Sequence, residues 1–127
     1  MNAIQFIKEH GVDKARKVID GAPEWAMSIN FNNGMYYSRM EHKKGDTFLY
    51  DIKRLVESVD LIGKYHSIDH AKNHYNNMRE VLNQYQFENK DIDDLSNELK
   101  KAIADYELIY SIPESVRQAI LNLEMHL

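Results

Sequence analysis

The sequence contains no cysteine, only two prolines and five glycines, and no long uninterrupted hydrophobic run. Without cysteine, the chain has no disulfide framework, no thiol nucleophile and no thiolate metal ligand. A membrane-spanning helix needs about 20 consecutive apolar residues, and the opening NAIQFIKEHG is too short and too charged for a secretory signal. We therefore expect a protein that does not span a membrane and that resides in the cytoplasm.

The composition is that of a globular protein. Hydrophobic residues make up 43% of the 127 residues and charged residues 28%, which excludes disordered and fibrous classes. The net charge of −4 is unevenly distributed: residues 1–54 carry nine Lys/Arg and seven Asp/Glu, whereas residues 55–127 carry seven and thirteen. An acidic chain with only a local basic patch is unlike most proteins that bind DNA nonspecifically.

Two short helices and a small sheet are predicted for the first 50 residues. Apolar residues at helical spacing lead up to Gly11 and again to Gly21, which predicts a helical hairpin over residues 1–22. In residues 25–50, β-forming residues flank Asn32-Asn33-Gly34, a hairpin-turn sequence. We predict antiparallel strands near 25–31 and 35–41, a second turn at 44–46 and a third strand at 47–50.

Helical periodicity begins after Asp51, a predicted N-cap, and continues to the C-terminus. It predicts four amphipathic helices arranged as two hairpins. Their boundaries are Gly63, Ser67, the acidic stretch 88–94, and the capping-box sequence 111–114. The apolar stripes consist of Ile52, Leu55, Val56, Val59 and Ile62; Ile68, Ala71, Tyr75, Met78, Leu82 and Tyr85; Leu95, Leu99, Ala102, Ile103, Tyr106 and Ile109; and Ile112, Val116, Ala119, Ile120 and Leu123.

The predicted fold class is therefore α+β, mainly α, in a single domain over residues 1–127. Within the helical part, 51–127, residues 51–62 resemble residues 98–109 in type at most positions. Residues 8–16 of the N-terminal hairpin resemble residues 64–72. These echoes favour one helical-hairpin unit used repeatedly. The alternative is that amphipathic helices with Lys and Glu on the wet face look alike by chance.

Three histidines, His66, His70 and His74, stand four residues apart in YHSIDHAKNHY. Ser67 is the predicted N-cap of the following helix, so His66 precedes that helix and only His70 and His74 form a true i, i+4 pair. Both lie on the flank or the wet face, beside the apolar stripe. Because a zinc site needs three or four protein ligands, we expect solvated histidines, no metal and no other cofactor. A metal-dependent hydrolase centred on His70 and His74 is the least favoured alternative.

The predicted β segment contains the candidate binding residues. MYYSRMEHKKGD interleaves aromatic and basic side chains, a composition suited to stacking on bases and contacting phosphates. The more frequent outcome for such a hairpin is that its inward aromatics are core and its basic turn is solvated. The candidates for contact with a partner or a nucleic acid are Tyr36, Tyr37, Arg39, His42, Lys43 and Lys44.

Catalytic motifs are not found in the sequence. The five glycines stand alone, so no glycine-rich phosphate loop is present, and no serine lies in a G-x-S-x-G elbow. The acidic run at 91–94 lacks the glycine of a calcium-binding EF-hand and is better explained by helix capping. We expect a protein that is not an enzyme.

The stretches NAIQFIKEHGVDKARKVIDGAP, DIKRLVESVDLIGKYHSIDHAKNHY and ELKKAIADYELIY resemble small accessory proteins encoded in the early regions of lambdoid phages and enterobacterial prophages. The resemblance covers the N-terminal hairpin and the later helices, and matches the β segment less clearly. It implies a bacterial cytoplasm and a non-enzymatic role in which the protein binds a host or phage macromolecule, in some cases to blunt host defence.

These observations predict stoichiometric binding to a host or phage protein, such as a host nuclease or defence component. The acidic C-terminal half suits a basic partner surface. The alternative is a regulator that binds nucleic acid through the β segment. A homodimer is compatible with either function.

Overall fold

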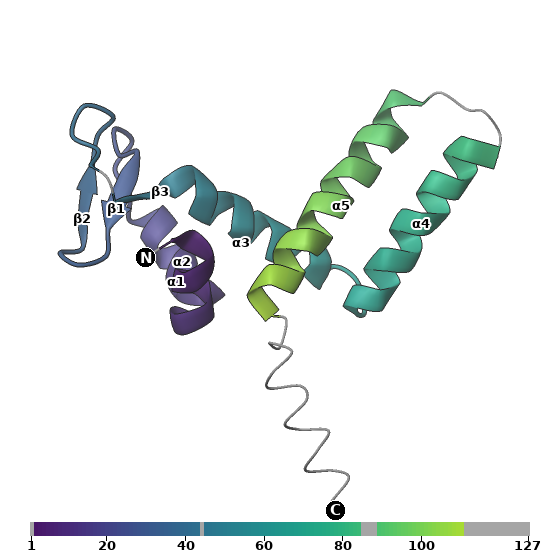
Figure 1. The fold of residues 1–127 in the computed structure, drawn as a ribbon, viewed down its shortest axis with the longest axis horizontal. Helices are drawn as coiled ribbons and strands as arrows, with labels where there is room; N and C mark the ends of the chain where they lie inside the picture. The colour runs from purple at the N-terminus through teal and green to yellow at the C-terminus, as the bar shows by residue number, and fades with distance from the viewer. Residues whose placement is uncertain (1, 44, 85–88, 111–127) are drawn as a thin grey trace, which may run out of the picture.

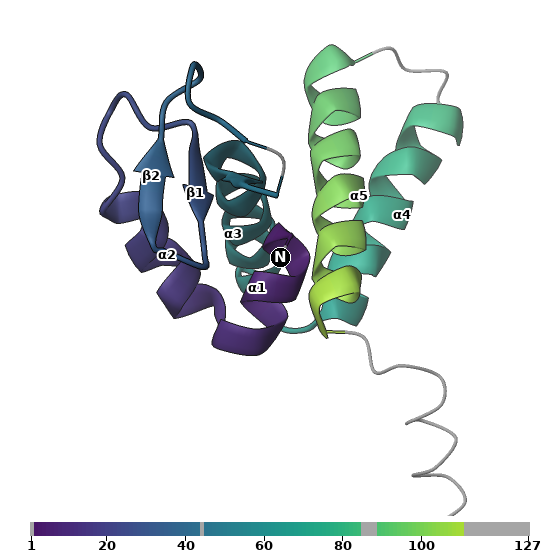
Figure 2. The same cartoon turned by 60° about the vertical axis from the view of Figure 1, so that its left-hand side comes forward.

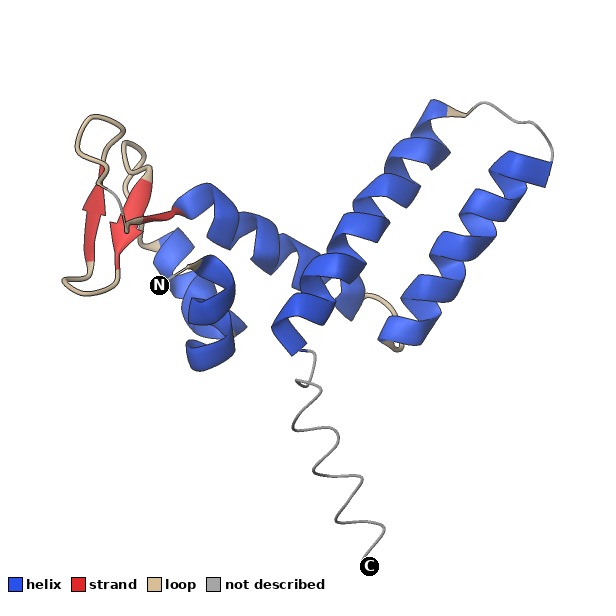
Figure 3. Ribbon diagram, in the orientation of Figure 1, coloured by secondary structure: helices blue, strands red, loops and turns tan. Residues whose placement is uncertain are grey.

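The computed structural model describes residues 2–43, 45–84 and 89–110. Within these residues it contains five helices and a three-stranded antiparallel sheet, which confirms the predicted α+β, mainly α class (Figure 3). The sheet and the two short N-terminal helices form one end of the molecule, and two long antiparallel helices form the other (Figure 1).

The predicted N-terminal hairpin is confirmed as α1, Ala3–His10, and α2, Val12–Asp20. The side chain of Asn2 caps α1 by accepting a hydrogen bond from the Gln5 backbone N–H at 2.8 Å. Gly11 separates the two helices with φ +88°, a conformation that L side chains rarely adopt. This glycine therefore sets the sharp reversal that places α1 against α2.

The sheet consists of β1, Ser28–Asn30, β2, Met35–Tyr37, and β3, Thr47–Phe48, in the order β2-β1-β3. The predicted turn at 32–34 is confirmed: Gly34 has φ +70°, and its N–H donates to the Asn30 carbonyl at 2.7 Å. Each strand is shorter than predicted. The β-forming residue Trp25 lies in a turn before β1, because local β propensity is expressed only where a neighbouring strand pairs.

Helix α3, Leu49–Gly63, begins two residues before the predicted N-cap. Asp51 lies in the first turn of the helix, where its negative charge interacts favourably with the helix dipole. The Leu49 N–H donates to the Met27 carbonyl at 3.0 Å, so the hydrogen bonds between β1 and β3 extend into the start of the helix. The chain consequently passes from strand to helix without a loop, and the predicted third strand ends at Phe48.

The two long helices are α4, Ile68–Gln84, and α5, Lys90–Tyr110. Ser67 caps α4 as predicted, accepting from the His70 backbone N–H at 3.2 Å. Helix α5 lies between α3 and α4, and α4 pairs with α5 instead of with α3 (Figures 1 and 2). The fourth predicted helix, with the capping box at 111–114, falls outside the described residues.

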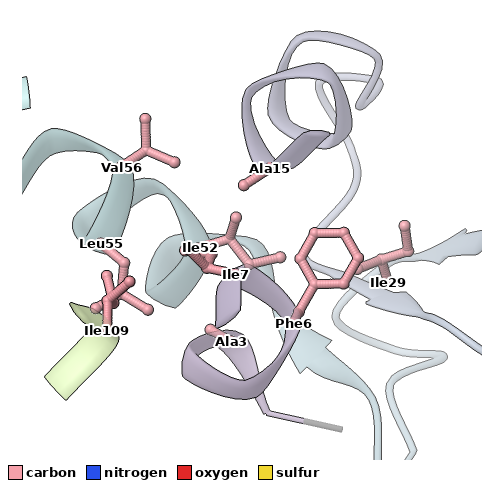
Figure 4. Close-up of a cluster of buried hydrophobic side chains, with 9 residues drawn as sticks. All are labelled: Ala3, Phe6, Ile7, Ala15, Ile29, Ile52, Leu55, Val56 and Ile109. Atoms are coloured by element: carbon pink, nitrogen blue, oxygen red, sulfur yellow. The ribbon is translucent and has the colours of Figure 1, made fainter. Parts of the chain in front are cut away.

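Two hydrophobic clusters hold the described elements together. The first joins α1, α2, β1 and α3 to the end of α5 (Figure 4), and Phe31, just after β1, stacks on Phe6 of α1 with ring centroids 4.1 Å apart. The second joins the end of α3 to α4 and α5. The buried members of the first are Ala3, Phe6, Ile7, Ala15, Ile29, Ile52, Leu55, Val56 and Ile109, and those of the second are Ile62, Ala71, Leu99 and Ala102.

The longer sequence echo corresponds to equivalent positions in these clusters. Leu55 of α3 aligns with Ala102 of α5, and Ile62 aligns with Ile109. In the first cluster Leu55 accompanies Ile109, and in the second Ala102 accompanies Ile62. Each cluster thus combines one of the two equivalent positions from α3 with the other one from α5.

The shorter sequence echo also corresponds to equivalent buried positions. Ala15 of α2 and Ala71 of α4 occupy equivalent positions, and each is 0% exposed, one in each cluster. A small residue at such a point lets two helices approach closely. Helix α2 therefore packs on α3 much as α4 packs on α5.

Equivalent ion pairs border these two contacts. Arg16 of α2 forms a two-pronged pair with Asp60 of α3, and Lys72 of α4 pairs with Glu107 of α5. In the echoes Arg16 aligns with Lys72 and Asp60 with Glu107. The hydrogen bonds from Arg16 hold the pKa of Asp60 below its ordinary value. An ion pair between equivalent positions thus joins α2 to α3 and α4 to α5.

Candidate partner-binding site

The two candidate tyrosines have structural roles within the sheet. The hydroxyl of Tyr36 donates to the Val18 carbonyl of α2 at 2.7 Å, and burial raises its pKa. The hydroxyl of Tyr37 accepts from Asn33 Nδ2 at 2.9 Å across the hairpin turn. Tyr36 faces the helices, and Tyr37, the next residue along β2, faces the opposite side of the sheet.

The candidate basic residues are only partly brought together. Arg39 and Lys43 are exposed in the loop after β2, whereas His42 is half-buried, and Lys44 lies outside the described residues. Residues 24–50 carry three Lys/Arg and three Asp/Glu, so the segment has no excess of positive charge. Phosphate contacts depend on such an excess. The charge balance therefore favours a protein partner over a nucleic acid.

His42 fastens this loop over the outer face of the sheet. Its ring stacks on Phe48 of β3 with centroids 4.4 Å apart, and its Nδ1 lies 3.0 Å from Ser28 Oγ. Asp46 Oδ2 lies 3.9 Å from the same nitrogen. A catalytic triad needs the serine and the carboxylate on opposite ring nitrogens and an accessible hydroxyl, and Ser28 is fully buried. These three side chains position the loop and do not form a triad.

Asp46 is the second anchor of the loop. Its carboxylate accepts hydrogen bonds from the Lys43 backbone N–H and from Asn30 Nδ2, each at 3.0 Å. The bond from Lys43, together with that from Asn30, lowers the pKa of Asp46 below its ordinary value. This role could not be predicted from the sequence, because an Asp next to a Gly indicates only a turn.

The Asp46→Asn variant is expected to unfold at a lower temperature than the wild type at pH 7. Because the folded-state pKa lies below the ordinary value of 3.8, the ionised carboxylate stabilises the fold at neutral pH, and this stabilisation disappears as the pH falls through the folded-state pKa. The difference in melting temperature should therefore shrink below about pH 4. Thermal unfolding followed by circular dichroism over a pH series measures it.

The matched control for this prediction is Glu24→Gln, which neutralises an exposed acid of the same segment. Its melting temperature should follow that of the wild type across the series. A difference for Asp46→Asn that stays constant from neutral to acidic pH would show that the charge of Asp46 does not stabilise the loop.

Large apolar side chains are exposed around the sheet, and the sequence did not single them out. Trp25 is 59% exposed, Met35 57%, Met40 94% and Tyr50 73%. All four belong to the strands or to the segments directly joined to them, at one end of the molecule (Figure 2). We call this group the sheet-end residues. Trp25 and Tyr50 were predicted to lie in strands. The observed strands are shorter than predicted, so both residues lie outside the sheet.

The three histidines of the α3–α4 junction bind neighbouring side chains. His70 Nδ1 lies 2.8 Å from Ser67 Oγ, and His74 Nδ1 lies 2.7 Å from the Tyr65 hydroxyl. The rings of His66 and His70 meet edge to face at 5.3 Å. Among the described residues, no three or more His, Cys, Asp or Glu side chains are placed to share a metal ion. The Nδ1 atoms of His70 and His74 are thus directed at different hydroxyl groups.

No protein-family description, curated protein or solved structure matches this chain. Of the helices in the described part of the chain, none is both long and apolar enough to cross a membrane.

Proposed function

We propose that this protein acts by binding another protein stoichiometrically, without catalysing a reaction. The observation that carries the proposal is the exposure of the sheet-end residues, Trp25, Met35, Met40 and Tyr50. Exposed apolar side chains gathered on one part of a small protein are typical of protein contact sites, and tryptophan and tyrosine are frequent energetic anchors there. Methionine adapts its shape to different partners.

The cellular setting of this proposal comes from the sequence resemblance to phage and prophage accessory proteins. That resemblance supports a bacterial cytoplasm as the setting, where the partner would be a host nuclease or another defence component. The acidic charge of residues 55–127 supports a partner with a basic surface, because complementary charge speeds and selects encounter.

Nucleic-acid binding is the second candidate, and the exposure of Arg39 and Lys43 favours it. It ranks below protein binding because Tyr36 is tied to the Val18 carbonyl and the segment carries balanced charge. Retention of labelled single-stranded nucleic acid at low salt, abolished by Lys43→Glu, would reverse this order.

The proposal is tested by affinity capture from nuclease-treated enterobacterial lysate, followed by mass spectrometry and measurement of the stoichiometry. The wild type should retain one partner saturably, and Trp25→Ser/Met40→Ser should lose it. Lys53→Ser, at an exposed site of α3, is the control that should keep the partner. Recovery of the same proteins by the wild type and by both variants would count against binding through the sheet end. Recovery of background proteins alone would count against the proposed function.

A further inference from the structure

The first half of α5 extends beyond the helix that covers its second half. Helix α3 meets the second half of α5 through the second cluster, which contains Ile62 and Ala102, and through the bond between Ser58 and Asp105. Before Leu99, α5 is held on one side by Arg79 of α4, which donates to Asp93 at 2.6 Å. Figure 1 shows this half of α5 projecting past α3 beside α4. The flank of α5 that α3 covers further along is consequently open here.

One leucine of the apolar stripe is exposed on this open flank. Leu95 is 56% exposed, whereas Leu99, one turn further on the same stripe, is 2% exposed. Asp91, Asp94 and Glu98 stand four residues before, one before and three after Leu95, and all three are exposed. At helical spacing the three acids lie along one side of Leu95, with Asp91 and Glu98 nearer to it than Asp94. We call these four residues the acidic face of α5.

In the described part of the chain, no basic side chain forms an ion pair with the carboxylates of this face. Within the described residues, Asp91, Asp94 and Glu98 take part in no ion pair or side-chain hydrogen bond, and Arg79 is engaged by Asp93 instead. The helix dipole accounts for an acid in the first turn, such as Asp91, but its effect fades before Glu98. Like charges three and four residues apart also disfavour the helix. The face therefore carries charge that the described residues leave unpaired.

We propose that the acidic face of α5 binds a basic amphipathic segment of the partner protein. An aliphatic side chain of that segment covers Leu95, and flanking Lys or Arg side chains meet the three carboxylates. This inference rests on the proposed function, protein binding, and specifies the chemistry of the partner at a second surface. Removing the leucine from water supplies affinity, and the charges supply the rate and selectivity of encounter.

Charge argues against the other occupants of this face. The chain's own residues 111–127 contain one arginine and two glutamates, so they offer no positive charge to complement it. A second copy carries the same net charge of −4, so it offers no overall positive charge to complement this face. Nucleic acid is repelled by three carboxylates. A basic protein segment is the occupant that satisfies both the leucine and the acids.

The test is a titration of the full-length, 15N-labelled protein with a short helical peptide of leucine and lysine, monitored by NMR. Amide shifts should centre on residues 91–98 and weaken at high salt. A matched peptide with glutamate in place of lysine should leave them unchanged. Leu95→Ser, which keeps every charge, and Asp91→Asn/Asp94→Asn/Glu98→Gln should each weaken binding about tenfold or more.

Two control variants separate this face from general attraction to an acidic protein. Asp69→Asn/Glu80→Gln neutralises exposed acids of α4, and Leu108→Ser alters an exposed leucine on another side of α5. Both should bind the peptide as the wild type does, and every variant should retain wild-type shifts away from the substituted helix. Shifts centred on the sheet, equal weakening by the control variants, or self-association that Leu95→Ser abolishes would each overturn the inference.

Failure of this inference can be distinguished from failure of the proposed function. A partner captured from lysate through Trp25 and Met40 but retained by Leu95→Ser would leave the function standing and remove the acidic face from it. Peptide binding at the acidic face together with capture of background proteins alone would remove the sheet-end proposal and leave the surface on α5.

Discussion

The Leu55→Ala variant is expected to lose about 2–5 kcal/mol of unfolding free energy. Leu55 is 0% exposed and belongs to the first cluster, where α3 meets α1 and the end of α5. Truncation removes its buried methyl groups and leaves a cavity that helices held on several sides cannot close fully. Because small domains are stable by only about 5–15 kcal/mol, the variant should be close to unfolding. Urea denaturation measures the change.

Leu108→Ala is the matched control for this prediction. The same substitution is made at a leucine of α5 that is 51% exposed, so it should change stability by no more than about 0.5 kcal/mol. Equal losses for the two variants would mean that α3 does not occupy the centre of the first cluster.

The Asp105→Ala variant is expected to lose about 1–3 kcal/mol. Asp105 is buried in the contact between α3 and α5, where its Oδ2 accepts from Ser58 Oγ at 2.7 Å and lies 3.5 Å from Arg54 Nε. Alanine leaves the buried Ser58 hydroxyl without this acceptor, and an unmet buried polar group is costly. The half-exposed Arg54 contributes less, because water screens its charge.

A double-mutant cycle with Ser58→Ala isolates the contribution of this hydrogen bond. If the hydroxyl and the carboxylate act as a pair, the double variant should lose less than the sum of the two single variants, by about 0.5 kcal/mol or more. Asp94→Ala, at an exposed acid of the same helix, should lose little. Strict additivity would indicate that Ser58 and Asp105 stabilise the protein independently.

The described helices could be predicted from the sequence because almost all residues of their apolar stripes are buried or half-buried in the fold. Ile52, Leu55 and Ile62 are buried as their spacing requires. Leu95 departs from the pattern because periodicity identifies a face of a helix but not how far along it a neighbour extends. Asp105 is the opposite case. A carboxylate beside an apolar stripe is expected to be exposed to water, but the crossing of α3 and α5 buries it next to the Ser58 hydroxyl.

The sequence predicted the segment that contains the candidate site but not the directions in which its side chains point. The alternation of side chains along a strand shows that Tyr36 and Tyr37 face opposite ways, but it does not show which one faces the helices. That choice follows from the position of α2, whose Val18 carbonyl accepts from Tyr36. Met40 stood in the predicted second strand, and its exposure follows from the early end of β2 at Tyr37.

The sheet lies in the sequence between α2 and α3, and this has a consequence for the order in which the protein folds. Helices α4 and α5 are joined by residues 85–89 alone, so they can meet after closing a short loop. Helix α2 meets α3 only once residues 21–48 have been brought back on themselves. Contacts near in sequence form faster than distant ones. We expect the hairpin of α4 and α5 to form first and to serve as the nucleus on which the sheet and helices α1 to α3 then pack.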